Sequence, residues 1–194
     1  MCSSDLIVDG SGHVIKSLHA NNQLNRARFS PDGRLVATAS FDDPENPETW
    51  SLQIWDWRRD IVLHTISGGW VVDFDPTGSR IVTLDRQGRG EIVDVESERQ
   101  VALLAGQLQD INDVAFSPDG ALVATAGSDG AVRLFDAETG VQRLALPRQP
   151  CRVGDVAFSA DGTRLASASP CDGVRIWALD IDDLLQIARQ KVTR

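Results

Sequence analysis

The chain has 194 residues, of which 42% are hydrophobic and 24% are charged, and its formal net charge is −9. This composition is typical of a globular chain of one or two domains, with enough apolar material to form a core without disulfides or metal. The acidic balance disfavours binding to nucleic acid or to an anionic membrane. No apolar run approaches the ~20 residues that span a bilayer, and the N-terminus lacks signal-peptide features, so we expect a cytoplasmic protein.

The first 20 residues contain two short apolar runs, Leu6-Ile-Val8 and Val14-Ile-Lys-Ser-Leu18, which predict two β-strands. They match the third and fourth strands of the four-stranded unit that repeats later, so residues 1–20 are interpreted as the end of a partial unit. The sequence Met1-Cys-Ser-Ser-Asp-Leu6 also matches the translation of a common sequencing-adapter end. In that second interpretation residues 1–6 are artefactual.

Two sequence markers then recur along the chain. The first is a phenylalanine followed by an Asp-Gly-like turn, and successive phenylalanines are 45, 42 and 42 residues apart. It reads Phe29-Ser-Pro-Asp-Gly33, Phe74-Asp-Pro-Thr-Gly78, Phe116-Ser-Pro-Asp-Gly120 and Phe158-Ser-Ala-Asp-Gly162. The second marker is an aromatic or apolar residue, in three cases followed by aspartate, and it reads Trp55-Asp56, Val93-Asp94, Phe135-Asp136 and Trp177-Ala178. Two markers with a common period indicate an internal repeat.

The segments between the markers predict β-strands. Leu122-Val-Ala-Thr-Ala126 is a short apolar run that suits a strand covered on both faces, and Asp129-Gly130 then reverses the chain into the alternating Val132-Arg-Leu-Phe135. A fourth strand follows over Val141–Leu146. Each unit is therefore expected to be a four-stranded antiparallel meander that must stack on its neighbours. The predicted units are 21–66, 67–106, 107–148 and a three-stranded 149–179.

The chain resembles the WD-repeat β-propeller family in its period and in the Trp-Asp-like ending of each third strand. The resemblance implies an all-β fold of four-stranded antiparallel blades, with about four repeats in a partial or open propeller. It also implies that the aromatic residues of the second marker pack between blades and that an aspartate occupies each tight turn between second and third strands. The structural residues so assigned are Trp55, Asp56, Asp94, Phe135, Asp136 and Trp177 in the markers, and Asp85, Asp129 and Asp172 in the tight turns.

The sequence departs from the family pattern at several positions. The turn aspartate of the family usually joins a hydrogen-bond network with a Ser or Thr, the Trp and a Gly-His dipeptide. Here Gln107 and Gln149 occupy the histidine position, and His19 lies one residue away from it. The glutamine side chain is expected to donate a weaker hydrogen bond in place of the histidine. Unit 67–106 is the most degenerate, with Val93 at the aromatic position, so we expect it to pack least well.

The ends of the chain allow two interpretations. The N-terminal strand completes the last unit in a closed four-bladed ring, or the chain is a fragment of a longer protein, which is the preferred hypothesis. Residues 180–194 predict an amphipathic helix, because Leu184, Ile187 and Ala188 fall on one face. This helix packs on the propeller rim or connects to another domain, as in bacterial multidomain regulators whose WD-repeat regions end in a similar segment. A truncated propeller would expose sheet edges and is expected to self-associate.

The sequence predicts no catalytic, cofactor or metal site. His13 and His19 are expected at opposite ends of one blade, so they cannot bind the same metal ion or act on the same serine. Cys151 and Cys171 are expected on the same face of the last unit, where they could bridge under oxidation, although two separate reduced thiols are favoured.

Recognition is therefore the expected activity. The first hypothesis is a protein- or peptide-binding scaffold module of a larger cytoplasmic signalling or regulatory protein, with no catalysis of its own. The alternatives are the accessory propeller of a kinase, NTPase or peptidase whose catalytic domain is missing, and a small-molecule sensor using the central channel. Trp50, at the end of a seven-residue insertion, is the strongest candidate contact. The candidate binding face comprises Trp50, Trp70, Asn25, Arg26, Asn112, Asp113, Arg152 and Asp155.

Overall fold

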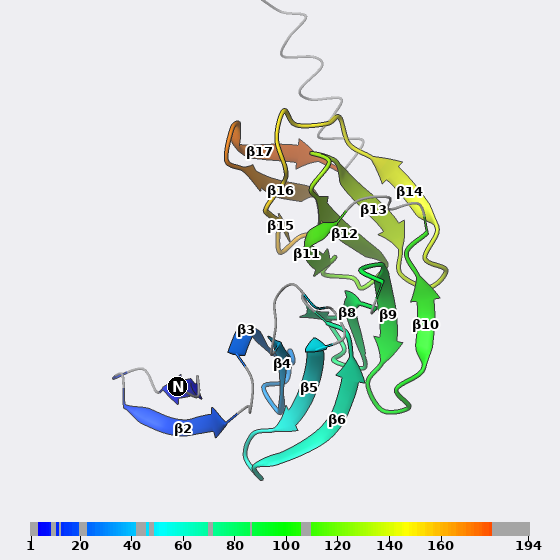
Figure 1. The fold of residues 1–194 in the computed structure, drawn as a ribbon. Coiled ribbons are helices and arrows are strands. Elements are labelled where there is room, and N and C mark those ends of the chain that lie inside the picture. The colour runs from blue at the N-terminus through cyan, green and yellow to red at the C-terminus, as the bar shows by residue number, and fades with distance from the viewer. Residues whose placement is uncertain are drawn as a thin grey trace, which may run out of the picture. The chain divides into compact units, whose positions relative to one another are not determined.

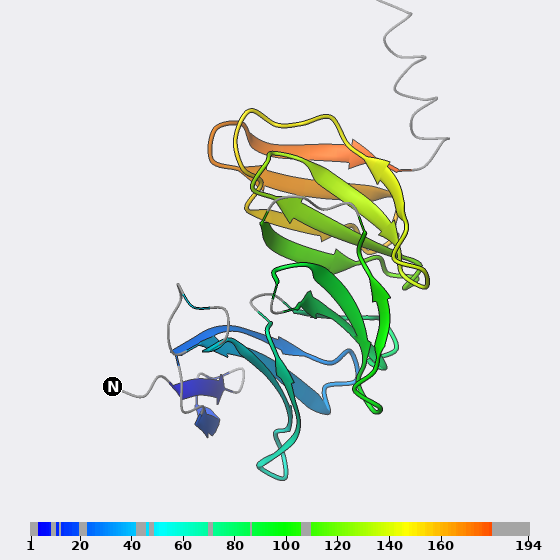
Figure 2. The same cartoon turned by 45° about the vertical axis from the view of Figure 1, so that its right-hand side comes forward.

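The computed structural model describes residues 4–8, 11, 13–19, 23–41, 46, 49–69, 72–85, 87–105 and 110–179. All the regular elements in these ranges are β-strands, which pair in antiparallel order within five sheets (Figures 1 and 2). The chain divides into two compact units, Met1–Leu103 and Leu104–Arg194. The predicted helix over residues 180–194, Gln107 and Trp70 lie outside the described residues.

Unit 1 contains a two-stranded sheet and two four-stranded sheets. In the two-stranded sheet, β1 (Ser4–Val8) pairs with β2 (Val14–His19). The next sheet has the order β3 (Gln23–Phe29), β4 (Leu35–Phe41), β5 (Ser51–Asp56) and β6 (Ile61–Ser67). The third has β7 (Asp73–Phe74), β8 (Arg80–Leu84), β9 (Gly90–Asp94) and β10 (Gln100–Leu103). Each four-stranded sheet is a simple meander, as the turn spacing predicts.

Unit 2 contains one four-stranded and one three-stranded sheet. The first is built from β11 (Ile111–Phe116), β12 (Leu122–Gly127), β13 (Val132–Asp136) and β14 (Gln142–Ala145). The second is built from β15 (Asp155–Phe158), β16 (Arg164–Ser169) and β17 (Gly173–Ala178). The first strands of the two sheets, β11 and β15, lie beside each other (Figures 1 and 2).

The core of unit 1 lies between its two four-stranded sheets. Ala37 and Ile54 face each other across β4 and β5 and pack with Ile81 and Val93 of the next sheet. Ile81 is 0% exposed and Val93 is 3% exposed. Val93 therefore fills the marker position of β9 as a buried apolar residue. That this second sheet packs least well stays a prediction.

The core of unit 2 lies in the same place, between its two sheets. Ala124 and Leu134 of the first sheet pack with Val156 and Leu165 of the second. Small alanines on β12 allow the sheets to approach closely, and burying a side chain such as Leu165 contributes about 1.5–3 kcal/mol. Trp177 packs at the margin of this cluster and is partly buried. Each sheet thus gains its stability from its neighbour.

The outer face of the last sheet is less covered. Val174 and Ile176 on β17 are 66% and 62% exposed, and in the described residues β17 pairs with β16 alone. Exposed apolar residues on an edge strand are consistent with self-association. That association stays a prediction.

Candidate functional site

A hydroxyl–carboxylate pair fixes the turn between the first and second strands of each three- or four-stranded sheet. In the turn from β3 to β4, Ser30 Oγ donates to Asp32 Oδ1 at 2.6 Å, and the Arg34 backbone N donates to the same carboxylate at 3.0 Å. Ser30 Oγ accepts a hydrogen bond from the Leu35 backbone N at 2.9 Å. These bonds, first that from Ser30 and then that from Arg34, hold the pKa of Asp32 below its ordinary value.

The same turn recurs in both sheets of unit 2. Ser117 donates to Asp119 at 2.5 Å, and Ser159 donates to Asp161 at 2.5 Å. Thr163 adds hydrogen bonds from its backbone N and its hydroxyl to Asp161. The bond from Ser159, followed by those from Thr163, lowers the pKa of Asp161 to about 2. The carboxylate of each turn is therefore ionised over the whole physiological range.

In the turn from β7 to β8 the two partners exchange places. Asp75 stands where the other turns have serine, and Thr77 stands where they have aspartate. Thr77 Oγ1 donates to the Asp75 carboxylate at 2.9 and 3.0 Å, and the Arg80 backbone N donates to Asp75 Oδ1 at 3.0 Å. Asp75 is 1% exposed, and its charge is balanced by Arg80 Nε at 3.2 Å. The turn keeps its geometry although its sequence is reversed.

The aspartates of the second marker stabilise the turn between the third and fourth strands. They are Asp56, Asp94 and Asp136. Asp94 Oδ1 accepts from the backbone N and the hydroxyl of Ser97, at 2.8 and 2.6 Å. Asp136 accepts from the backbone N and the hydroxyl of Thr139, and also from Arg143 at 2.8 Å. The Arg143 bond is the largest cause of a pKa of Asp136 far below the ordinary value.

The aspartates of the tight turns between second and third strands bind arginines. They are Asp85, Asp129 and Asp172, placed where the sequence predicts them. Asp85 pairs with Arg89 at 2.7 Å, and Asp172 pairs with Arg175. Asp129 pairs with Arg133 at 2.7 Å and Arg148 at 3.2 Å, and the Arg133 bond is the largest cause that lowers its pKa. The implied link from these aspartates to a tryptophan network is thus replaced by ion pairs.

A separate buried network joins the tryptophans to hydroxyl groups. Trp55 Nε1 donates to Thr38 Oγ1 at 3.0 Å, and Trp177 Nε1 donates to Ser167 Oγ at 2.9 Å. Gln149, which occupies the expected histidine position, also donates to Ser167 Oγ, at 2.6 Å. Its side chain is 4% exposed. Glutamine therefore supplies the hydrogen bond expected of the family's histidine, and links the chain that enters the last sheet to that sheet.

A groove lies between the two four-stranded sheets of unit 1, beside their first turns. Its volume is about 410 Å³. Its lining includes the carboxylates of Asp32, Asp94 and Glu96, the cation of Arg34 and the apolar side chains of Leu35 and Leu63. His64 also borders it, and its Nδ1 lies 2.6 Å from Glu98 Oε1. A concave surface of mixed polarity on rigid turns is suited to holding a ligand or a peptide segment.

Unit 2 has an equivalent groove between its two sheets. Its volume is about 420 Å³, and Asp119, Leu122, Asp161 and Leu179 contribute to its lining. The two grooves occupy the same position relative to the first turns of their sheets. The sequence predicts a binding face at the other connections and does not predict either groove. The available signal was the recurring turn after each phenylalanine of the first marker, since these turns form part of the groove walls.

The candidate contacts in unit 1 lie at different depths. Asn25 and Arg26 fall on β3, where the register shifts between Leu24 and Arg26, and Arg26 is half-buried. Trp50 directly precedes β5 and is half-buried, and its backbone O accepts a hydrogen bond from Gly68 N at 2.9 Å. This bond ties the backbone of Trp50 to the residue that follows β6.

The candidate contacts in unit 2 divide into internal and exposed residues. Asp113 is 2% exposed and its Oδ2 accepts from the Val156 backbone N at 3.1 Å. Asn112 Nδ2 donates to the Val153 backbone O at 2.7 Å. The assignment of Asp113 to a partner surface is therefore wrong, because a register shift between Ile111 and Asp113 turns it inward to join the two sheets. Arg152 and Asp155 are exposed.

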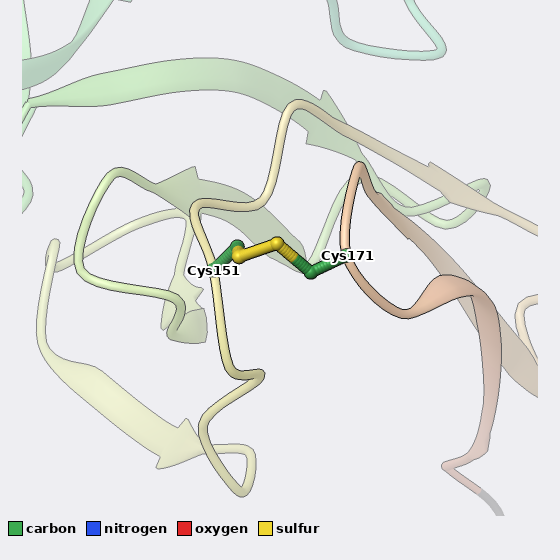
Figure 3. Close-up of a disulfide and its surroundings, with 2 residues drawn as sticks. All are labelled: Cys151 and Cys171. Carbon is green, nitrogen blue, oxygen red and sulfur yellow. A yellow bond between two sulfur atoms is a disulfide. The ribbon is translucent and has the colours of Figure 1, made fainter.

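Cys151 and Cys171 form a disulfide (Figure 3), with a Cα–Cα distance of 5.9 Å. The expectation of two separate thiols is wrong for this structure. The connector from β14 to β15 carries Cys151, the turn from β16 to β17 carries Cys171, and both reach the same end of the sheet. Cys171 is exposed and Cys151 is half-buried.

The described part of the chain holds no group of three or more His, Cys, Asp or Glu side chains arranged to bind a metal ion. It also contains no helix that is long and apolar enough to cross a membrane.

Comparison with known families accounts for the repeat. The family described as "WD domain, G-beta repeat" matches residues 12–43, 98–136 and 142–178, which together exceed half of the chain. The chain belongs to the WD-repeat family. Its predicted fold class, an all-β partial propeller of four-stranded antiparallel blades, is confirmed. No curated protein matches the chain.

The stretch between the first two matches covers β5 and β6 of the first four-stranded blade and most of the second. It contains the insertion before Trp50, the exchanged Asp75–Thr77 pair and Val93 in place of an aromatic residue. The structure forms a WD blade there nonetheless, because the exchanged pair makes the same turn and Val93 packs in the core. The local sequence has diverged while the blade has been retained.

The WD blades share a third marker that the two sequence markers do not reveal. A buried hydroxyl residue lies on the second strand, nine residues after each phenylalanine of the first marker. These residues are Thr38, Thr83, Thr125 and Ser167, each no more than 1% exposed. A hydroxyl at a constant spacing inside an apolar run was the available signal, since a buried polar group needs a partner.

Proposed function

We propose that this WD-repeat chain is a protein- or peptide-binding scaffold module of a larger cytoplasmic signalling or regulatory protein. WD repeats generally serve as scaffolds for protein interactions. The chain is acidic, and hydrogen bonds hold its turn aspartates in place in their ionised form. These carboxylates can accept hydrogen bonds from a polar partner surface. No step of chemistry is needed for this role.

The observation that carries the proposal is the groove of unit 1. Its walls are reverse turns held by charge-assisted hydrogen bonds, so little conformational entropy is lost when a partner binds. Leu63 offers an apolar contact that is 41% exposed, and Asp32, Asp94 and Glu96 provide acceptors around it. A partner segment with one apolar side chain and flanking donors, such as lysine or arginine, fits these features.

Other candidate residues extend the proposed contact surface within each unit. In unit 1 the half-buried Trp50 offers an aromatic side chain. In unit 2 Arg152 and Asp155 offer opposite charges at the connector into the last blade. Each is a proposed contact of its own unit.

The test is a peptide-display selection against the whole chain, followed by calorimetric affinity measurement of the selected peptides. Replacing Leu63 by Glu in the unit 1 groove is expected to weaken binding by about tenfold or more, because the contact of a large apolar side chain is lost. Ile61→Glu is the matched control. Ile61 lies on the same strand and is 44% exposed, but it is outside the groove lining. The Ile61→Glu variant should therefore change the peptide affinity by less than about twofold.

Two outcomes would count against the proposal. Selection that enriches no peptide would contradict a peptide-binding role. Enriched peptides that lose affinity equally in Ile61→Glu and Leu63→Glu would contradict the groove as the contact. Trp50→Ala, measured on the same peptides, separates a contribution of the loop from that of the groove.

A further inference from the structure

The connector into the last blade is clamped to the blade before it. Its backbone donates from Gln149 N to Gly130 O at 2.8 Å and from Val153 N to Gly127 O at 3.1 Å. Asn112 Nδ2 also donates to Val153 O. The approach is so close that a Cβ at Gly130 would overlap the Gln149 carbonyl oxygen, and the positive φ of 79° also favours glycine there.

The same connector is fastened to the last blade by two links. One is covalent, the disulfide from Cys151 to Cys171 in the turn between β16 and β17 (Figure 3). The other is the hydrogen bond from Gln149 Nε2 to Ser167 Oγ, which also receives the indole N–H of Trp177. The disulfide therefore ties a segment held by one blade to a turn that belongs to the next.

The two cysteines have matching surroundings. Each follows a proline, in Gln149-Pro-Cys151 and Ser169-Pro-Cys171, and each proline follows a buried polar residue. Gln149 Oε1 and Ser169 Oγ are buried and have no hydrogen-bond partner within the described part of the chain. Since an unpaired buried oxygen is unfavourable, both segments would gain hydrogen bonds to water on moving outward. The disulfide holds them in place against that tendency.

We propose that Cys151 and Cys171 form a reversible redox staple, whose reduction by a dithiol releases the connector at residues 149–153 from the last blade while the β-sheets stay folded. Three features support this. Cys171 is exposed and accessible to a reductant, the sheets contribute most of the apolar core, to which the connector adds Val153, and the connector and turn lie outside the strands.

The exchange is balanced as follows. A thiolate of the dithiol attacks Sγ of Cys171, the Cys151–Cys171 bond breaks, and Cys151 leaves as a thiolate that takes up a proton. The second thiol of the reductant then displaces Cys171 from the mixed disulfide. The protein gains two electrons and two protons, and the dithiol becomes a disulfide.

The experiment is hydrogen–deuterium exchange with mass spectrometry on the whole chain, oxidised and after treatment with dithiothreitol. The amides of Gln149 and Val153 are expected to exchange about tenfold faster in the reduced chain, because the hydrogen bonds that protect them open more often. Peptides from the core strand β12 should exchange at an unchanged rate. Removing the reductant and adding oxidised glutathione should restore the slow exchange.

Variants make the test specific. Cys151→Ser with Cys171→Ser should behave as the reduced chain and show no response to dithiothreitol, whereas Cys2→Ser should keep the full response. Equal exchange in the oxidised and reduced chains would overturn the proposal. So would faster exchange of β12 on reduction, which would make the disulfide a requirement of the fold. If the double variant does not fold, the reduced wild-type chain still decides between these outcomes.

Discussion

Ser167 accepts two hydrogen bonds from buried donors. Gln149 Nε2 and Trp177 Nε1 both reach its hydroxyl, at 2.6 and 2.9 Å, and Ser167 is 1% exposed. Thr38 accepts from Trp55 in the first complete blade at the same position. One hydroxyl on the second strand therefore satisfies the indole N–H of a tryptophan on the third strand, which allows that large side chain to be buried or partly buried.

Ser167→Ala is expected to destabilise unit 2 by about 2–3 kcal/mol, because two buried donors lose their acceptor. Urea unfolding followed by circular dichroism measures the loss. In a double-mutant cycle, adding Trp177→Phe removes one of those donors, so the combined cost should be smaller than the sum of the two single costs. Strict additivity would show that Ser167 and Trp177 do not act together.

Hydroxyl and carboxylate groups define the first turn of the three four-stranded blades and of the three-stranded last blade. Three turns have serine first and aspartate second, and the second blade has Asp75 first and Thr77 second. In all four the residue in first place accepts a hydrogen bond from the backbone N that starts the second strand. Either order satisfies that backbone group, so the turn depends on the pair and not on its direction.

Exchanging the pair in the first complete blade tests this. The Ser30→Asp variant has two carboxylates and no hydroxyl in the turn. The Asp32→Thr variant has two hydroxyls and no carboxylate. Each single variant should therefore lower the thermal unfolding midpoint. The combined Ser30→Asp, Asp32→Thr variant should recover most of the loss, as in the natural Asp75–Thr77 turn. A combined variant less stable than either single one would refute the equivalence.

The turn aspartates also predict how stability depends on pH. The folded pKa of Asp161 is about 2, below the about 3.9 of an aspartate in an unfolded chain. Its contribution is therefore fully present above about pH 4 and is lost as the pH falls from about 4 to 2. Asp161→Asn should lower the free energy of unfolding at pH 6, and the difference from the wild type should shrink toward pH 2. A difference that is constant across this range would contradict the assignment.

At the scale of the whole molecule, local sequence predicted the repeat and the meander well. Asp-Gly turns and apolar runs act within a few residues, so their positions follow from the chain itself. Local sequence patterns do not predict contacts between segments that are distant in the chain. The disulfide depends on the fold bringing the connector and the turn together, and the inward direction of Asp113 depends on a register shift in β11. Single-sequence patterns fix neither the register nor the loop paths.

The repetition of one groove in both units has a consequence for affinity. The grooves of about 410 and 420 Å³ have the same kind of wall, the turn between the first and second strands of each of two successive blades. If both grooves bind the proposed motif, we expect a partner with two such motifs, joined by a flexible linker long enough to reach both, to bind the second motif at a high effective concentration. Avidity of this kind raises overall binding by about 10²–10⁴ without any new contact. Two weak grooves are thus expected to favour a partner with two motifs over a partner with one.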